Sequence, residues 1–243
     1  MAKLKLAEER EINILAFGNS LTEGYTDWGM TLHPYAIELR KTLSAEYPNR
    51  NVTVDVNGQS GDFVISSFGG NFFTRLQSSY EKLAEKGKSY DLVIALGGTN
   101  DLAMASYDEK GPEKIFAALK LCYDYILQGG SSLLVLTVPE RSLDTEKDGK
   151  FKHMISSRLR LNELLKEYVT SQASASPSKV FMMDLAAMVP FPVVAKDDDN
   201  FTWDYQLWSP DGLHMSTLGY NFVGGELGSL IQQLLSEEKP EEE

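Results

Sequence analysis

INILAF, residues Ile12–Phe17, is the first of five short runs rich in Val, Ile and Leu. It is mostly apolar and does not alternate with polar residues, which is typical of a strand buried on both faces of a sheet. The four later runs are Val52–Asn57 (VTVDVN), Asp91–Leu96 (DLVIAL), Leu133–Val138 (LLVLTV) and Lys179–Asp184 (KVFMMD). Val52–Asn57 does alternate, so we expect that run at the edge of the sheet.

Segments with the apolar spacing of helices lie between and after these runs. We expect helices at Pro34–Tyr47, Phe73–Lys86, Pro112–Leu127, His153–Ser171 and Thr217–Ser236. Strand and helix thus alternate five times, which predicts an α/β fold with a parallel sheet and helices on both faces. We see no internal repeat and no linker, and we therefore expect one domain over residues 1–236, followed by an acidic tail at 237–243.

Composition excludes several classes of protein. The 243 residues carry a net charge of −12, which argues against a nucleic-acid partner bound by neutralising its phosphates. One cysteine, Cys122, and three histidines leave little material for a disulfide framework or a metal site, and we expect no metal. No apolar run approaches the roughly 18 residues of a membrane span. The N-terminal residues MAKLKLAEER lack the apolar core of a signal peptide, so we expect a cytoplasmic protein.

Glycine and small polar residues follow the first three runs, where ligands bind in open parallel sheets. These loops are Gly18–Leu21 (GNSL), Gly58–Asp62 (GQSGD) and Gly97–Asp101 (GGTND). Asp211–His214 (DGLH) precedes the last expected helix, and a spacing of three residues on a helical turn puts carboxylate and imidazole on one side.

Together these loops contain the groups that acyl transfer needs. Ser20 is the candidate nucleophile, His214 the candidate general base, and Asp211 the residue that orients the imidazole. The backbone N–H groups of Ser20 and Gly61 and the side-chain amide of Asn100 are candidate donors to an oxyanion. The alternative for each is a local structural role, such as a helix cap at Ser20 or a surface position for His214.

Four blocks of sequence carry a resemblance to a known family. They are GNSLTEGY (Gly18–Tyr25), Asn57 with Ser60-Gly61-Asp62, Gly98-Thr99-Asn100-Asp101, and Asp211-x-x-His214. In this order they resemble the blocks of the SGNH hydrolases, the GDSL esterase/lipase family. The family's working Ser, Gly, Asn and His correspond to Ser20, Gly61, Asn100 and His214.

The resemblance implies a flavodoxin-like, three-layer α/β/α sandwich with a five-stranded parallel sheet in the order 2-1-3-4-5. It also implies hydrolysis of small-molecule carboxylic esters without a cofactor. One position departs from the pattern, because Asn19 stands where the family has the Asp of G-D-S-L. We expect activity to survive this loss of negative charge, with a changed pH dependence or substrate preference.

Aromatic residues close to these blocks suggest a substrate pocket. The candidate lining residues are Asn19, Tyr25, Trp28, Trp203 and Trp208. Such side chains suit an acyl chain or an apolar alcohol, and they equally suit stacking on a sugar or merely closing the end of the sheet. Three functions therefore remain open: an esterase for short to medium acyl chains, a glycan O-acetyl esterase, or a catalytically silent binding protein.

Overall fold

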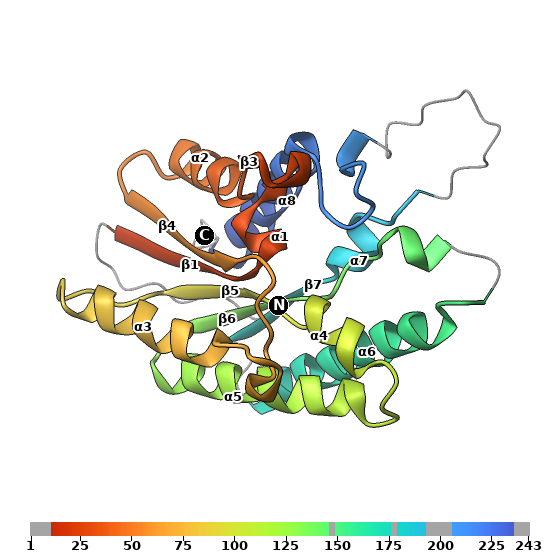
Figure 1. The fold of residues 1–243 in the computed structure, drawn as a ribbon. Coiled ribbons are helices and arrows are strands. Elements are labelled where there is room, and N and C mark those ends of the chain that lie inside the picture. The colour runs from red at the N-terminus through yellow and green to blue at the C-terminus, as the bar shows by residue number, and fades with distance from the viewer. Residues whose placement is uncertain (1–10, 146–148, 176–178, 193–205, 236–243) are drawn as a thin grey trace, which may run out of the picture.

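A five-stranded parallel sheet lies between two layers of helices in the computed structural model, which describes residues 11–145, 149–175, 179–192 and 206–235 (Figure 1). The strands of this sheet are β1 (Glu11–Asn19), β4 (Asn51–Gln59), β5 (Leu92–Leu96), β6 (Ser132–Leu136) and β7 (Val180–Met183). They lie in the order β4-β1-β5-β6-β7, which is 2-1-3-4-5 when these five are counted along the chain. The predicted α/β/α sandwich is confirmed.

The long helices form around the apolar stripes that the sequence predicts, with ends that differ by a few residues. They are α2 (Ala36–Glu46), α3 (Phe72–Ala84), α5 (Gly111–Gln128), α6 (Lys152–Ala175) and α8 (Thr217–Leu235). Helices α2 and α8 pack on one face of the sheet, and α3, α5 and α6 on the other (Figure 1).

The strands are apolar on both sides because each face has its own core. In β1, Ile14 and Ala16 belong to the core beneath α2 and α8, whereas Leu15 and Phe17 belong to the core of the opposite face. Strand β4 lies at one edge of the sheet, as its alternating pattern predicts, and its Val56 is 43% exposed.

Short elements that the sequence analysis left as loops also appear. They are the helices α1 (Ser20–Glu23), α4 (Thr99–Ala105) and α7 (Leu185–Met188), the 3-10 turns η1 (Asp27–Gly29), η2 (Ser66–Phe68) and η3 (Ser142–Thr145), and the strands β2 (Tyr25–Thr26) and β3 (Thr31–Leu32). Strands β2 and β3 pair as a separate antiparallel hairpin. Helix α1 begins where β1 ends and α4 begins three residues after β5, so both start at the carboxyl edge of the sheet.

Candidate active site

Ser20 is the first residue of α1, held at the carboxyl end of β1, which lies between β4 and β5 in the sheet. The side-chain oxygen of Asn19 accepts a hydrogen bond from the backbone N–H of Leu21 at 3.2 Å and so caps the helix. Gly24 ends α1 in the left-handed region, at φ 82°. The single turn between them fixes the position of the Ser20 hydroxyl.

A close passage of backbone directly before Ser20 explains Gly18. A Cβ atom at this position would lie 2.2 Å from Oγ1 of Thr22 and 2.5 Å from the carbonyl oxygen of Leu96. Only glycine therefore allows β1 to turn into α1 while it remains packed beside β5.

His214 connects Ser20 to Asp211 through both of its ring nitrogens. Its Nε2 atom lies 2.9 Å from Oγ of Ser20, and its Nδ1 atom lies 2.8 Å from Oδ2 of Asp211. Ser20 and His214 are both buried, at 5% and 9% exposure. The structure thus brings together the three residues that the sequence analysis proposed, in the geometry of a Ser–His–Asp triad.

The local structure around Asp211 differs from the expected helical turn. Oδ1 of Asp211 accepts hydrogen bonds from the backbone N–H groups of Leu213 and His214, each at 2.9 Å, in a turn that precedes α8. These two bonds fix the loop from Asp211 to His214, and the loop in turn places the two side chains against each other. The spacing predicted the contact correctly and the conformation wrongly.

The same contacts set the charge of Asp211. Burial alone would raise its pKa, but the N–H bonds from His214 and Leu213, together with the imidazole, hold the pKa below its ordinary value of 3.8. Asp211 is therefore an anion at neutral pH and can only accept hydrogen bonds. Nδ1 of His214 then carries the proton, which leaves Nε2 of the neutral ring free to accept from Ser20.

Gly61 and Asn100 come from the next two loops along the same edge of the sheet. Gly61 has a left-handed φ of 75°, and a Cβ there would meet no heavy atom of the described chain within 4 Å. The side-chain Nδ2 of Asn100 donates to the carbonyl oxygen of Asp62 at 2.8 Å. That bond uses one of the two amide hydrogens and leaves the other for a ligand.

Asp101 anchors the loop that follows Gly61. It is fully buried and accepts hydrogen bonds from the backbone N–H groups of Val64 and Ile65, at 3.1 and 2.9 Å. Burial raises the pKa of Asp101, and the two N–H bonds oppose that rise. The loop that carries Gly61 is thereby tied to α4, the helix that carries Asn100.

Residues 16–222 match the family model of the GDSL-like lipases and acylhydrolases, a span that includes all of these residues. The chain belongs to this family. The predicted resemblance to the GDSL family is confirmed. A comparison with curated proteins gives no match to the chain.

Solved structures of several other hydrolases share the fold of this chain at low sequence identity. A lipase/acylhydrolase from Enterococcus faecalis is 19% identical, with a TM-score of 0.64 and coverage of 94% of this chain and 99% of that one. A carbohydrate acetylesterase from Sinorhizobium meliloti is 18% identical, with a TM-score of 0.61 and coverage of 92% and 100%. The aryl esterase of M. smegmatis is 20% identical, with a TM-score of 0.59 and the same coverage.

The candidate pocket residues of this GDSL-like chain have different surroundings. Tyr25 packs against the ring of His214, and Trp28, in the β2–β3 hairpin, is 67% exposed. Asn19 is 1% exposed and caps α1, so the prediction that it lines the pocket is wrong.

The same prediction for Trp208 is also wrong, because Trp208 is 4% exposed, its ring packs against Phe191 and its Nε1 donates to the carbonyl oxygen of Pro190. Trp203 lies outside the described residues.

A contact that the sequence analysis missed joins α1 to the loop of Gly61. Oε2 of Glu23 accepts a hydrogen bond from the backbone N–H of Ser60 at 2.8 Å and a second bond from its hydroxyl. Glu23 lies one turn after Ser20, and Ser60 precedes Gly61. Nothing in the sequence distinguishes this glutamate, since its partner is 37 residues away.

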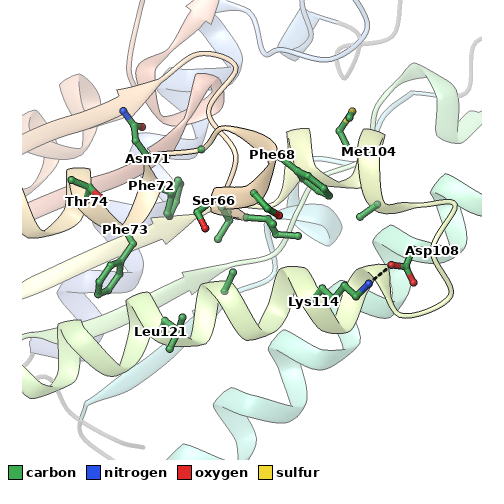
Figure 2. Close-up of a pocket in the computed structure, with 16 residues that line it drawn as sticks. Ser66, Phe68, Asn71, Phe72, Phe73, Thr74, Met104, Asp108, Lys114 and Leu121 are labelled. Atoms are coloured by element: carbon green, nitrogen blue, oxygen red, sulfur yellow. Dashed lines mark hydrogen bonds and ion pairs between the residues drawn. The ribbon is translucent and has the colours of Figure 1, made fainter.

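A hollow of about 610 Å³ lies outside the triad, between the loop after β4 and helices α3, α4 and α5 (Figure 2). Its wall is largely apolar, with Phe68, Phe72, Phe73 and Met104, and the ion pair of Lys114 with Asp108 lies at one end. It includes neither Ser20 nor His214.

The described residues hold no group of three or more His, Cys, Asp or Glu side chains placed to bind a metal ion. None of the helices in the described part of the chain is long and apolar enough to cross a membrane.

Proposed function

We propose that this protein is a serine esterase that hydrolyses carboxylic esters with short to medium acyl chains through an acyl-Ser20 intermediate. The observation that carries the proposal is the continuous hydrogen-bond chain from Ser20 through His214 to Asp211, with distances of 2.9 and 2.8 Å. Membership of an acylhydrolase family supports the same reaction class.

The reaction begins with the Ser20 hydroxyl. Oγ attacks the ester carbonyl carbon while Nε2 of His214 takes the hydroxyl proton. The Asp211 carboxylate stabilises the imidazolium that results and keeps the proton of Nδ1 directed toward itself. The imidazolium then donates the proton from Nε2 to the leaving alkoxide, the C–O bond breaks, and the alcohol departs.

Water then hydrolyses the acyl-Ser20 intermediate. His214 removes a proton from a water molecule, the hydroxide attacks the acyl carbon, and the proton returns to Oγ as the acid leaves. In both steps the carbonyl oxygen becomes an anion. The N–H groups of Ser20 and Gly61 and the second amide hydrogen of Asn100 donate to it, and losing one such donor typically costs about 100-fold or more in rate.

The hairpin with Tyr25 and Trp28 supports the proposed size of the substrate. Tyr25 contacts the base directly, and Trp28 offers an exposed indole on the same hairpin. One aromatic wall of this kind suits a short acyl group or an aryl alcohol. An O-acetylated sugar is the second candidate, favoured by the exposed Trp28 and by the fold shared with a carbohydrate acetylesterase.

The test compares wild type, Ser20→Ala and the control Ser229→Ala, which removes an exposed hydroxyl on α8. Each is assayed on 4-nitrophenyl esters from acetyl to decanoyl and on peracetylated sugars, and each is treated with a fluorophosphonate and mapped by mass spectrometry. We expect wild type and Ser229→Ala to be active and labelled at Ser20, and Ser20→Ala to be neither. If wild type is no more active than Ser20→Ala on every substrate and takes no label, the protein is a binding protein and the proposal fails.

A further inference from the structure

Arg75, on α3, lies beneath the loops that carry the proposed oxyanion donors. Its NH2 atom donates to the carbonyl oxygen of Gly18 at 2.7 Å, and its NH1 atom donates to the carbonyl oxygen of Asn57 at 3.0 Å and also to that residue's side-chain oxygen. Its Nε donates to Oδ2 of Asp62 at 2.9 Å, and NH2 lies 2.9 Å from the same oxygen. One guanidinium therefore binds the ends of β1 and β4 and the loop after β4.

Each of these partners is close in sequence to an oxyanion donor. Gly18 comes two residues before the N–H of Ser20, and Asp62 directly follows Gly61. The carbonyl oxygen of Asp62 in turn accepts the hydrogen bond of Asn100 at 2.8 Å. Arg75 thus holds Gly18, which precedes Ser20, and Asp62, which follows Gly61 and accepts the bond of Asn100. The relative positions of all three donors depend on these two residues.

Only arginine can make this set of contacts. The guanidinium is planar and offers five N–H donors in fixed directions, whereas a lysine offers a single point of charge. The plane also lies over two aromatic rings, with Cζ 5.1 Å from the centroid of Phe17 and 5.5 Å from that of Phe72. The Arg75 side chain is 11% exposed and that of Asp62 2%, so water competes little for these bonds.

We propose that Arg75 is a positioning residue that assembles the oxyanion hole from three separate loops. Arg75 acts on the reaction through Gly18, Asn57 and Asp62 and does not itself touch the substrate. This inference rests on the proposed esterase function, because the hole has a purpose only if a tetrahedral oxyanion forms at Ser20.

The first test measures kcat and KM of Arg75→Lys and Arg75→Met on the best ester of wild type. Arg160→Lys serves as the control, because Arg160 forms exposed ion pairs on α6. We expect kcat of both Arg75 variants to fall about 100-fold, the typical cost of one lost donor, with KM largely unchanged. The control retains the kcat of wild type. Because removal of Arg75 deprives the Asp62 carboxylate of its ion pair, the double variant Arg75→Met/Asp62→Asn is included, and circular dichroism establishes that each variant is folded.

The second test separates positioning from a general structural role. Replacing the carbonyl oxygen of the substrate with sulfur gives a thionoester, whose larger thiolate is poorly held by a hole shaped for oxygen. We expect wild type to prefer the ester strongly, and folded Arg75 variants to lose most of that preference. Methylguanidinium, added to Arg75→Ala, restores ester turnover, and methylammonium does not.

Two results would overturn the inference. One is a folded Arg75→Lys enzyme with the kcat of wild type. The other is a fall in activity that leaves the ratio of ester to thionoester turnover unchanged. A wild-type protein that turns over no ester refutes the proposed function instead, so the two failures are distinguishable.

Discussion

The ring of Tyr25 lies against the imidazole of His214, with ring centroids 4.4 Å apart and planes inclined by 39°. Tyr25 is itself held from two sides. Its carbonyl oxygen accepts a hydrogen bond from the hydroxyl of Tyr220 at 2.9 Å, and the Cα of Gly29 approaches so closely that a Cβ there would lie 2.8 Å from the Tyr25 ring. The β2–β3 hairpin therefore limits how the ring of the proposed base can move.

Removing this ring contact should slow the chemical step. An aromatic ring pair contributes about 0.5–1.5 kcal/mol beyond its buried area, so we expect Tyr25→Leu to lower kcat about two- to tenfold. Tyr25→Phe keeps the ring and should retain the kcat of wild type. Steady-state kinetics on one ester checks both variants. If the Phe variant loses as much as the Leu variant, the hydroxyl and not the ring contact is responsible.

Trp28 should affect substrate binding more than turnover. Its indole is 67% exposed on the hairpin beside Tyr25, so Trp28→Ala is expected to raise KM for aryl esters and leave kcat unchanged. Leu159→Ala, which shortens an exposed side chain on α6, is the control. An unchanged KM across aryl and alkyl esters would remove Trp28 from the binding site.

The backbone of Trp28 gives an independent expectation for stability. Trp28 has a φ of 57°, in the left-handed region that favours glycine. Both Trp28→Gly and Trp28→Ala remove the indole, but only glycine relieves the backbone, so the Gly variant should be the more stable by about 1 kcal/mol. Denaturant unfolding measures the difference. Equal stability of the two variants would mean that the conformation at residue 28 changes when the indole is lost.

Asp211→Asn should lower kcat on the order of 10³- to 10⁴-fold, because an amide can donate to Nδ1 and so stabilise the wrong tautomer of His214. Its effect on stability should depend on pH. The pKa of Asp211 in the folded protein is below the ordinary 3.8, so the stabilisation is present above that pH and is lost as the pH falls through the lower folded value.

Unfolding free energies of wild type and Asp211→Asn, measured from pH 7 to pH 3, check this sign. The difference between the two proteins should shrink toward acid. Asp124→Asn, which removes a surface carboxylate paired with Lys120, is the control for kcat. A difference in stability that grows toward acid would contradict the assigned charge of Asp211.

The sequence predicted the five strands well because four are nearly continuous apolar runs buried on both faces, and the fifth, β4, alternates as an edge strand should. It also predicted which loops meet, since parallel strands bring their carboxyl ends to one edge. It missed α1 and α4, which span only four and seven residues and therefore show no apolar period. The start of α1 is instead defined by a local hydrogen bond, which the side-chain oxygen of Asn19 accepts from the backbone N–H of Leu21.

Contacts between distant polar side chains were beyond the reach of sequence reasoning. Arg75 lies on the same helix as ordinary surface residues, and its partner Gly18 is 57 residues away. Trp208 shows the converse error, because an aromatic residue near a catalytic block resembles a pocket residue until its packing is known. Spacing along the chain indicates which residues are neighbours on one element, and it does not indicate what the fold places against them.

Cys122 should report unfolding and not react in the folded protein. Burial raises the pKa of its thiol to about 12, and the residue is 1% exposed. At pH 8 the thiolate, which is the reactive form, is therefore scarce and shielded. We expect an aromatic disulfide reagent to label no thiol in native buffer and one thiol per chain in 6 M guanidinium, with Cys122→Ala unlabelled in both. Rapid labelling in native buffer would show that α5 opens locally.

Asn19→Asp restores the residue that the family has before the nucleophile, and we expect a folded enzyme with a modest change in rate. An aspartate can still accept the N–H of Leu21, and it removes the Asn19 Nδ2 group, which is buried without a hydrogen-bond partner among the described residues. Against this gain, it places a negative charge beside Ser20, so we expect the pH dependence of kcat/KM to change. Asn19→Ala is the matched variant: it loses the cap of α1, at a cost of about 1 kcal/mol, and gains no charge.

Rate profiles from pH 5 to 9 and thermal unfolding compare the three proteins. A complete loss of activity in a folded Asn19→Asp protein would mean that the carboxylate displaces the Ser20 hydroxyl from His214, and that the loop tolerates only the neutral amide.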